Sequence, residues 1–294
     1  MKIAIYSKNL NRSGNEFIYD LFYKLKKNGI SIHAYLPFFN FLRDEFDYTI
    51  KAQSFFETHE DMEKDIDLFI CIGGDGTILE GVSYVRDFGI PILGINNGRM
   101  GFLANISKEE IPFAIDSLIR GNFSIEERTL IKLSTSNNLF GDFCYALNEL
   151  TVHKKDSSSM ITIHAFINNE FLNTYWADGL IISTPTGSTA YSLSVGGPIV
   201  VPDSETFIIT PIAPHNLTVR PIVVPNNNEI MLKVEGRSPN YLAALDYRSE
   251  TFDSSIELKI TKAEFKIKIF KLTSHSFFST LRNKLMWGID KRNY

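Results

Sequence analysis

The chain contains 294 residues, 44% of them hydrophobic and 22% charged, which is the balance of a globular protein with room for two domains. Its net charge of −4 argues against nucleic acid as a partner, because that binding needs a basic face. No apolar run is long enough for a signal peptide or a membrane span, so no membrane partner is expected. The two cysteines, Cys71 and Cys144, are expected in the core, and the chain is predicted to be cytoplasmic.

The first third of the chain alternates apolar runs with helical periodicity. Ser13-x-x-Glu16 is a capping box, and apolar residues at helical spacing follow it until Asn28-Gly29 gives a stop signal. A second helix is expected over 78–88. Strands are expected at 3–6, 30–35, 67–72 and 90–95. The pattern predicts an α/β domain over residues 1–104, built on a parallel, doubly wound sheet.

After about residue 120 the pattern changes to strand-like runs, most of them alternating. Examples are 160–166, 229–234, 256–260 and 265–269, with turn residues such as 225–228 between them. Alternation with one polar face favours antiparallel sheets, so a β-rich, sandwich-like domain is predicted over 105–272. A final segment, 273–294, returns to helical spacing and is expected to pack on the first domain.

The sharpest local motif is Gly73-Gly74-Asp75-Gly76-Thr77, between the strand at 67–72 and the next helix. Its glycines permit a tight turn close to a ligand, and a helix N-terminus offers N–H groups to phosphate. The motif is not a P-loop, because the chain contains no Gly-Lys dipeptide. It is not a dinucleotide fingerprint either, because Leu79 replaces the third glycine. The alternative is that Asp75 is only a turn residue or an N-cap.

A second block, Ser183 to Ser192, is rich in Ser and Thr and follows an apolar strand that begins after Asp178. Small hydroxyl side chains suit a polar, flat ligand such as adenosine, and Tyr191 beside them can cover a base. The alternative is an ordinary Ser/Thr-rich turn with Tyr191 in the core. Asn148-Glu149 carries no signal alone. The six histidines show no metal-ligand spacing, so no metal-binding residues are predicted.

The chain resembles the NAD kinase family in the order and spacing of four motifs: Gly73 to Thr77, Asn148-Glu149, Asp178-Gly179 and Thr184 to Tyr191. Further similar stretches are Pro91 to Asn96, Gly98 to Leu103, Gly196 to Pro198 and Pro211 to His215. The likeness is close over residues 67–225. The glycine motif alone is shared with diacylglycerol-type lipid kinases and, in related form, with phosphofructokinases. The Thr184 to Tyr191 block together with Asn148-Glu149 is far more specific.

The resemblance implies an enzyme that phosphorylates the 2′-hydroxyl of the adenosine ribose of NAD, using ATP or another donor, to give NADP. Asp75 would bind that ribose and act as general base, while Asn148 would bind the adenine and Glu149 the ribose. Asp178 would lie near the nicotinamide. Phosphates would be cradled by Gly73, Gly74 and Gly76. The other substrate-binding positions, most of them lining the adenine pocket, would be Thr189, Ala190, Tyr191, Ser192, Ser194 and Ala213.

The family resemblance also implies a divalent cation, Mg²⁺, that bridges the donor phosphates, and a homodimer or homotetramer. Three positions depart from the family pattern. Glu80 stands where many members have a basic residue, and Trp176-Ala177 precede Asp178. Asp246-Tyr247-Arg248 replaces a common Asp-Gly-Gln, and no role is assigned to it. A lipid kinase and a non-catalytic NAD-binding regulator are the alternatives. The sequence leaves open the phosphoryl donor, the acceptance of NADH and feedback by NADP.

Overall fold

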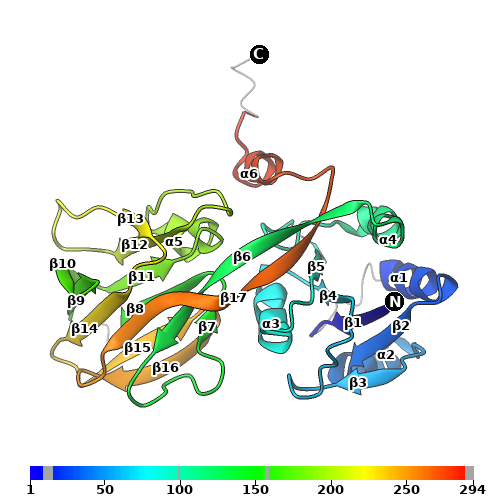
Figure 1. Cartoon of the computed structure of the whole chain (residues 1–294), viewed down its shortest axis with the longest axis horizontal. Helices are drawn as coiled ribbons and strands as arrows, with labels where there is room; N and C mark the ends of the chain where they lie inside the picture. The colour runs from blue at the N-terminus through cyan, green and yellow to red at the C-terminus, as the bar shows by residue number, and fades with distance from the viewer. Residues whose placement is uncertain (9–15, 99, 156–158, 289–294) are drawn as a thin grey trace. The chain divides into compact units, whose positions relative to one another are not determined.

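The computed structural model describes residues 1–8, 16–98, 100–155 and 159–288. The chain forms two compact units, which Figure 1 shows with their elements labelled. Unit 1 comprises Met1–Glu127 and Ile267–Tyr294, and unit 2 comprises Arg128–Lys266. These limits fall inside long strands, whereas the sequence placed domain limits at 104/105 and 272/273. Ser13 of the expected capping box lies outside the described residues, as does Arg99.

Unit 1 is built on a parallel sheet, as predicted. Its strands run in the order β17-β5-β4-β1-β2-β3, and each neighbouring pair is parallel. The strands are β1 (Lys2–Tyr6), β2 (Ser31–Tyr35), β3 (Ser54–Phe56), β4 (Leu68–Ile72), β5 (Ile92–Ile95) and the end of β17 (Leu258–Leu272). All five residues of β4 are buried, which is why its sequence is an uninterrupted apolar run.

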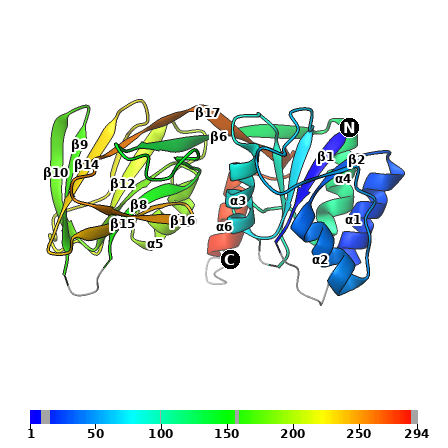
Figure 2. The same ribbon diagram turned by 90° about the horizontal axis from the view of Figure 1, so that it is seen from below.

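Helices cover both faces of this sheet, which makes it doubly wound. The helices of unit 1 are α1 (Glu16–Lys27), α2 (Leu36–Phe46), α3 (Asp75–Val85), α4 (Ile111–Arg120) and α6 (Phe277–Leu285). Apolar residues of α1 and α4 share one core cluster with Ile70 and Leu93 of the sheet. On the other face, a Cβ on Gly81 of α3 would lie 2.6 Å from the Cys71 sulfur, so α3 packs tightly there. Figure 2 shows α1 and α4 on one side of β1 and α3 on the other.

Unit 2 is an antiparallel sandwich, as predicted. One sheet contains β6 (Phe123–Ser134), β7 (Tyr145–Ala146), β9 (Ile161–Ile167), β10 (Glu170–Ala177), β14 (Ile230–Glu235) and the first part of β17. The other has the order β13 (Ile222–Pro225), β12 (Thr206–Ile212), β11 (Gly179–Ser183), β8 (Glu149–Lys154), β15 (Asn240–Leu245) and β16 (Arg248–Asp253). Alternate residues of both sheets share one apolar core.

Several expectations need correction. Helix α3 begins at Asp75 and ends at Val85, whereas the sequence placed it at 78–88. Residues 258–260 of the first run and the whole run 265–269 belong to one strand, β17, and over 258–269 its buried and exposed residues alternate with one change of phase at residues 261–262. Cys144 is only partly buried, although Cys71 is in the core as expected. No helix in the described ranges is long and apolar enough to cross a membrane.

Candidate active site

The glycine motif joins β4 to α3 at the carboxyl edge of the parallel sheet. The backbone N–H of Gly73 donates to the Ile95 carbonyl at 2.9 Å, which continues the pairing of β4 with β5. A Cβ on Gly73 would lie 2.1 Å from the Thr77 hydroxyl, so this position excludes a side chain. Gly74 and Gly76 are exposed, and a Cβ added at either position would meet no atom of the described residues within 4 Å. They leave open space at the N-terminus of α3, where a phosphate fits.

The carboxylate of Asp75 does not cap its own helix. Gly74 is the N-cap of α3, and Asp75 is the first helical residue. Its Oδ2 accepts the backbone N–H of Phe102 at 2.9 Å, and its Oδ1 accepts those of Leu103 at 3.0 Å and Ala104 at 2.8 Å. The alternative that Asp75 serves as an N-cap is therefore wrong. Three backbone donors from a distant loop fix the orientation of this carboxylate.

Gly101 makes this arrangement possible. A Cβ at position 101 would lie 1.9 Å from Oδ1 of Asp75 and 2.6 Å from its Cγ, well inside van der Waals contact. Only glycine therefore lets the loop approach the carboxylate closely enough for its N–H groups to donate. In the sequence, Gly101 falls in a stretch that resembles the family, but no role was expected of it.

Glu80, one of the departures noted in the sequence, has defined partners in unit 1. Its carboxylate accepts the Tyr6 hydroxyl at 2.6 Å and pairs with the Lys8 ammonium at 2.6 Å. Glu80 is acidic, but its ion pair brings the basic side chain of Lys8, which follows β1, next to α3. Glu80 thus binds two residues of β1 and its following loop.

The structure brings Asn148-Glu149 and the block around Thr184 together within unit 2. The Thr184 hydroxyl donates to the Leu147 carbonyl at 2.6 Å, and the Thr184 N–H donates to the Asn148 carbonyl at 2.8 Å. A Cβ on Gly187 would lie 2.3 Å from that same Asn148 carbonyl oxygen, so the turn packs directly on the strand. The backbone N–H of Tyr191 donates a hydrogen bond to the Glu149 carboxyl, which by itself lowers the pKa of that group. Two motifs about 40 residues apart in sequence therefore form one group.

Most hydroxyls of this block build the turn and face inward. The Ser188 hydroxyl donates to the Pro185 carbonyl at 2.7 Å, and Ser192 bonds to the Thr210 hydroxyl at 3.0 Å; both serines are fully buried. Tyr191 instead is 41% exposed, so the alternative that it is a core residue is wrong. Thr189 and Ala190 are partly exposed and Ser194 is exposed. The side chains open to a ligand are thus those around Tyr191.

Glu149 is a buried carboxyl beside another carboxyl. It is 9% exposed, and one of its oxygens, Oε2, has no hydrogen-bond partner. Burial, and after it the charge of Asp246, raise the pKa of Glu149 to about 8, against the opposing effect of the Tyr191 N–H. Burial raises the pKa of Asp246 as well, but its three backbone N–H donors and the charge of Arg248 oppose this effect, so Asp246 keeps its negative charge more readily than Glu149 does. Glu149 is therefore largely protonated at neutral pH in the free protein.

Replacing Glu149 with Gln should change how stability depends on pH. Between its ordinary pKa of 4.5 and the folded value of about 8, the folded state keeps a proton that the unfolded state has lost. The free energy of unfolding therefore falls as the pH rises through this range, and Glu149→Gln removes that contribution. We expect the variant to gain on the order of 3 kcal/mol over the native chain between pH 5 and pH 8. Urea unfolding of both proteins measures the difference, and a difference that stays constant with pH would contradict it.

Asp178 and Ala213 form a second group at the other end of β11. Gly179 pairs with His153 and Ser183 with Glu149, so about 13 Å of strand separates the two ends. Here the Asp178 carboxylate forms a 2.6 Å ion pair with Lys154, a partner that the sequence did not suggest. The Asp178 N–H donates to the carbonyl of Ile212, next to Ala213, which has an unusual positive φ of 45°. The predicted residues of unit 2 thus form two groups.

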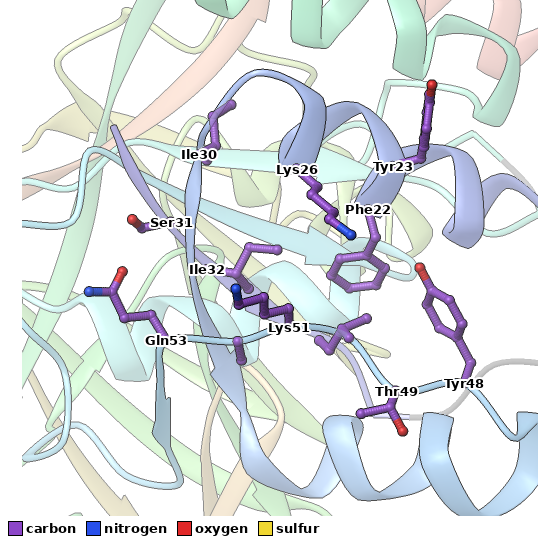
Figure 3. A pocket seen from close by; sticks show the side chains of 12 residues that line it. Phe22, Tyr23, Lys26, Ile30, Ser31, Ile32, Tyr48, Thr49, Lys51 and Gln53 are labelled. Carbon is purple, nitrogen blue, oxygen red and sulfur yellow. The ribbon is translucent and has the colours of Figure 1, made fainter.

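Two other features concern ligands. In the part of the chain that the structure describes, no group of three or more His, Cys, Asp or Glu side chains is placed to hold a metal ion. A hollow of about 520 Å³ lies in unit 1 between α1, β2 and residues 48–53, with Lys26 and Lys51 at its rim (Figure 3). None of the predicted site residues lines it.

A glycine loop that opens a helix in a parallel α/β sheet, followed by a β-sandwich, defines a two-domain protein that handles phosphate groups. Residues 38–123 match the ATP-NAD kinase N-terminal domain, and residues 147–272 match the ATP-NAD kinase C-terminal domain. The NAD kinase of Cytophaga hutchinsonii is 47% identical over 296 residues, and that of Flavobacterium johnsoniae is 46% identical over 295; each comparison covers 100% of both chains. The chain belongs to the NAD kinase family.

Solved structures agree with this assignment. Yeast NADH kinase, complexed with NADH, has a TM-score of 0.87 at 23% identity, covering 98% of this chain and 88% of that chain, which shows the shared fold. An NAD kinase from Archaeoglobus fulgidus in complex with ATP has a TM-score of 0.77 at 26% identity, covering 97% and 99%. The family membership predicted from the sequence motifs is confirmed, and the lipid kinase alternative is not retained.

Proposed function

We propose that Asp75 is the general base of the reaction that the chain catalyses as a member of the NAD kinase family. That reaction phosphorylates NAD to NADP with ATP. The 2′-hydroxyl oxygen of the adenosine ribose attacks the γ-phosphorus of ATP, and the bond from that phosphorus to the β-phosphate oxygen breaks. ADP leaves, and Asp75 takes the hydroxyl proton. The observation that carries this proposal is the fixed orientation of the Asp75 carboxylate at the glycine loop.

The hydrogen bonds of Asp75 support this role. A carboxylate offers about four acceptor sites, two on each oxygen. Among the described residues, Oδ1 accepts two N–H groups and Oδ2 accepts that of Phe102, so Oδ2 has a lone pair that can accept the ribose hydroxyl. Phosphoryl transfer depends mainly on positioning and charge balance, because its transition state is loose in most analyses. Asp75 would therefore orient the hydroxyl first and accept its proton late. Gly73, Gly74 and Gly76 would lie along the phosphates.

For the adenosine, we propose that Asn148 binds the adenine and Glu149 the ribose. Thr189, Ala190, Tyr191 and Ser194 would line the adenine pocket, with exposed Tyr191 covering the base. Ser192 is not included, because its buried hydroxyl bonds to Thr210. Asp178 would lie near the nicotinamide, with Ala213 as a further pocket position, and this group is joined to the first by β11.

We propose Mg²⁺ as the cation. Mg²⁺ keeps several of its waters and is usually bound by one or two carboxylates together with substrate phosphates. The donor triphosphate would therefore supply most of the ligands other than water, and the cation would offset the phosphate charge. The residues of this chain would contribute the open space beside Gly74 and Gly76, which admits a solvated phosphate–metal group.

One assay tests the function and its cation dependence. The purified chain is incubated with NAD, ATP and Mg²⁺, and NADP is measured with an NADP-specific dehydrogenase. We expect NADP with all components, and a loss of at least about 10²-fold when EDTA removes the cation, because charge on the transferred group is then unbalanced. Binding of NAD without formation of NADP would support the non-catalytic regulator instead. Replacing ATP with other triphosphates or polyphosphate, and NAD with NADH, defines the donor and acceptor.

We also propose a homodimer or homotetramer in the cytoplasm. Strand β10 lies at the edge of its sheet and exposes Phe171 and Trp176, each 56% exposed. An unpaired strand edge with large apolar side chains is a surface that a second copy of the chain can cover. Two free cysteines and a net charge of −4 support a reducing compartment and partners other than nucleic acid.

A further inference from the structure

Asp246 and Tyr247 form the turn between β15 and β16, and Arg248 is the first residue of β16; the reaction assigns no role to these three residues. Asp246 has a φ of 53°, in the left-handed region that Asp tolerates in tight turns. Its carboxylate accepts three successive backbone N–H groups, those of Leu147 at 2.8 Å, Asn148 at 2.8 Å and Glu149 at 3.1 Å. One charged group thereby fixes the main chain at the two residues proposed to bind adenosine.

Arg248 holds the residues just before this point. Its Nη2 donates to the Tyr145 carbonyl at 2.5 Å, and its Nη1 donates to the Phe143 carbonyl. The guanidinium carbon also lies 4.7 Å from the centre of the Phe143 ring. A planar guanidinium with parallel N–H groups suits two acceptors at once, which an ammonium group does not.

Arg248 and Asp246 bind backbone groups of opposite polarity in one segment, residues 143–149. Residues 143 and 145 present carbonyls to the cation of Arg248, and residues 147–149 present N–H groups to the anion of Asp246. The Asp246 N–H in turn donates to the Glu149 carbonyl at 3.1 Å. A shift of this segment along its axis would break both sets of bonds, and buried charges without partners are costly.

We infer that Asp246 and Arg248 are positioning residues for Asn148 and Glu149, and that they act on NAD binding through the main chain of residues 143–149. This inference rests on the proposed binding of adenosine by those two side chains. It assigns a role to the turn where this chain differs from the Asp-Gly-Gln pattern expected from the family.

The same turn sets the charge around Glu149. The Glu149 carboxyl faces the Asp246 charge from the β15–β16 turn and the N–H of Tyr191 from α5 (Tyr191–Ser194), while Arg248 acts on Asp246. Removing the negative charge at position 246 lowers the pKa of Glu149, because less repulsion opposes its ionisation. A general loss of stability in the variant would not by itself produce this shift.

The test compares Asp246→Asn with the native enzyme by steady-state kinetics from pH 6 to pH 9. We expect the KM for NAD to rise about tenfold while kcat stays within about threefold, since the variant disturbs binding more than chemistry. The pH at which the KM for NAD changes should move to a lower value, and the change should be absent in Glu149→Gln. A folded Asp246→Asn enzyme with native KM and an unshifted pH profile would overturn the inference.

Two further variants keep the test decisive. Arg248→Lys keeps the charge but cannot hold both carbonyls, so its KM for NAD should rise about threefold with an unshifted pH profile. If Asp246→Asn does not fold, a native KM in Arg248→Lys overturns the inference. Asp253→Asn is the matched control, because this carboxylate of the same hairpin bonds only within its own turn to Ser255 and should leave KM unchanged. A native chain that forms no NADP would contradict the proposed function itself, whereas an active chain with unaffected variants would contradict only this inference.

Discussion

Replacing Asp75 with Asn should lower turnover by at least about 10²-fold, the scale typical of a general base, while NAD still binds. Asn presents one acceptor oxygen and one NH₂ group. With the oxygen in the position of Oδ1, it keeps the bonds from Leu103 and Ala104 and loses only that from Phe102. The loop should therefore remain in place, and the loss should fall on kcat. Initial rates of NADP formation measure the loss, and calorimetry measures NAD binding.

The control for this variant is its stability. One lost hydrogen bond to a carboxylate costs about 1–3 kcal/mol, so the variant should unfold at a lower urea concentration but in the same cooperative transition. A variant with near-native turnover would show that Asp75 is not the base. A variant that has almost no turnover and no longer binds NAD would place Asp75 in binding and not in proton transfer.

Gly101→Ala should lower turnover nearly as much as Asp75→Asn does, although it changes no functional group of the site. The added Cβ would lie 1.9 Å from Oδ1 of Asp75, so either the loop or the carboxylate must move. A displacement of about 1 Å at a reacting group can lower the rate about 10²-fold. Kinetics at saturating NAD and ATP should therefore show a loss in kcat of that order. A crystal structure of the variant would show which of the two groups moves.

Gly98→Ala is the matched control in the same loop. Apart from the neighbouring residues in the chain, no atom of the described part of the structure lies within 4 Å of a Cβ at this position, and Gly98 is exposed without a positive φ. The two variants add the same methyl group three residues apart, so general effects on the loop's main chain cancel. Equal kcat in Gly101→Ala and Gly98→Ala would show that the contact with Asp75 does not matter for catalysis.

The fold was predictable because its strongest signals are local. The sequence of β4 is an uninterrupted apolar run because the strand is buried on both faces. The apolar residues of α1 follow helical spacing because that helix buries only one face. Helix α2 was missed, since Leu36–Phe46 is rich in aromatic residues and has no side-chain cap at its N-terminus. The end of β17 was not recognised as part of the parallel sheet, because its pairing with β5 joins residues about 180 positions apart.

The site was predictable only where a motif carries its own chemistry. Asp75 and Glu149 were proposed from their motifs, whereas Gly101, Asp246 and Arg248, which contact them or the main chain beside them, lie in distant parts of the sequence. Their contacts are mostly with backbone groups, which leave no signal in residue type. The hydroxyl-rich block was misleading in part: its composition is explained as much by hydrogen bonds within the block and to Leu147 and Thr210 as by a ligand.

The course of β17 has a consequence for biosynthesis. Unit 2 is a continuous stretch of chain, so it can fold while the ribosome is still completing the polypeptide. The parallel sheet of unit 1 instead waits for residues 267–272, because they pair with β5. Until those residues emerge, the start of β5 at Ile92 lacks its partner Ile269 and is an edge that other nascent chains can join. A stop codon just before position 267 would therefore damage the first unit to be synthesised more than the second.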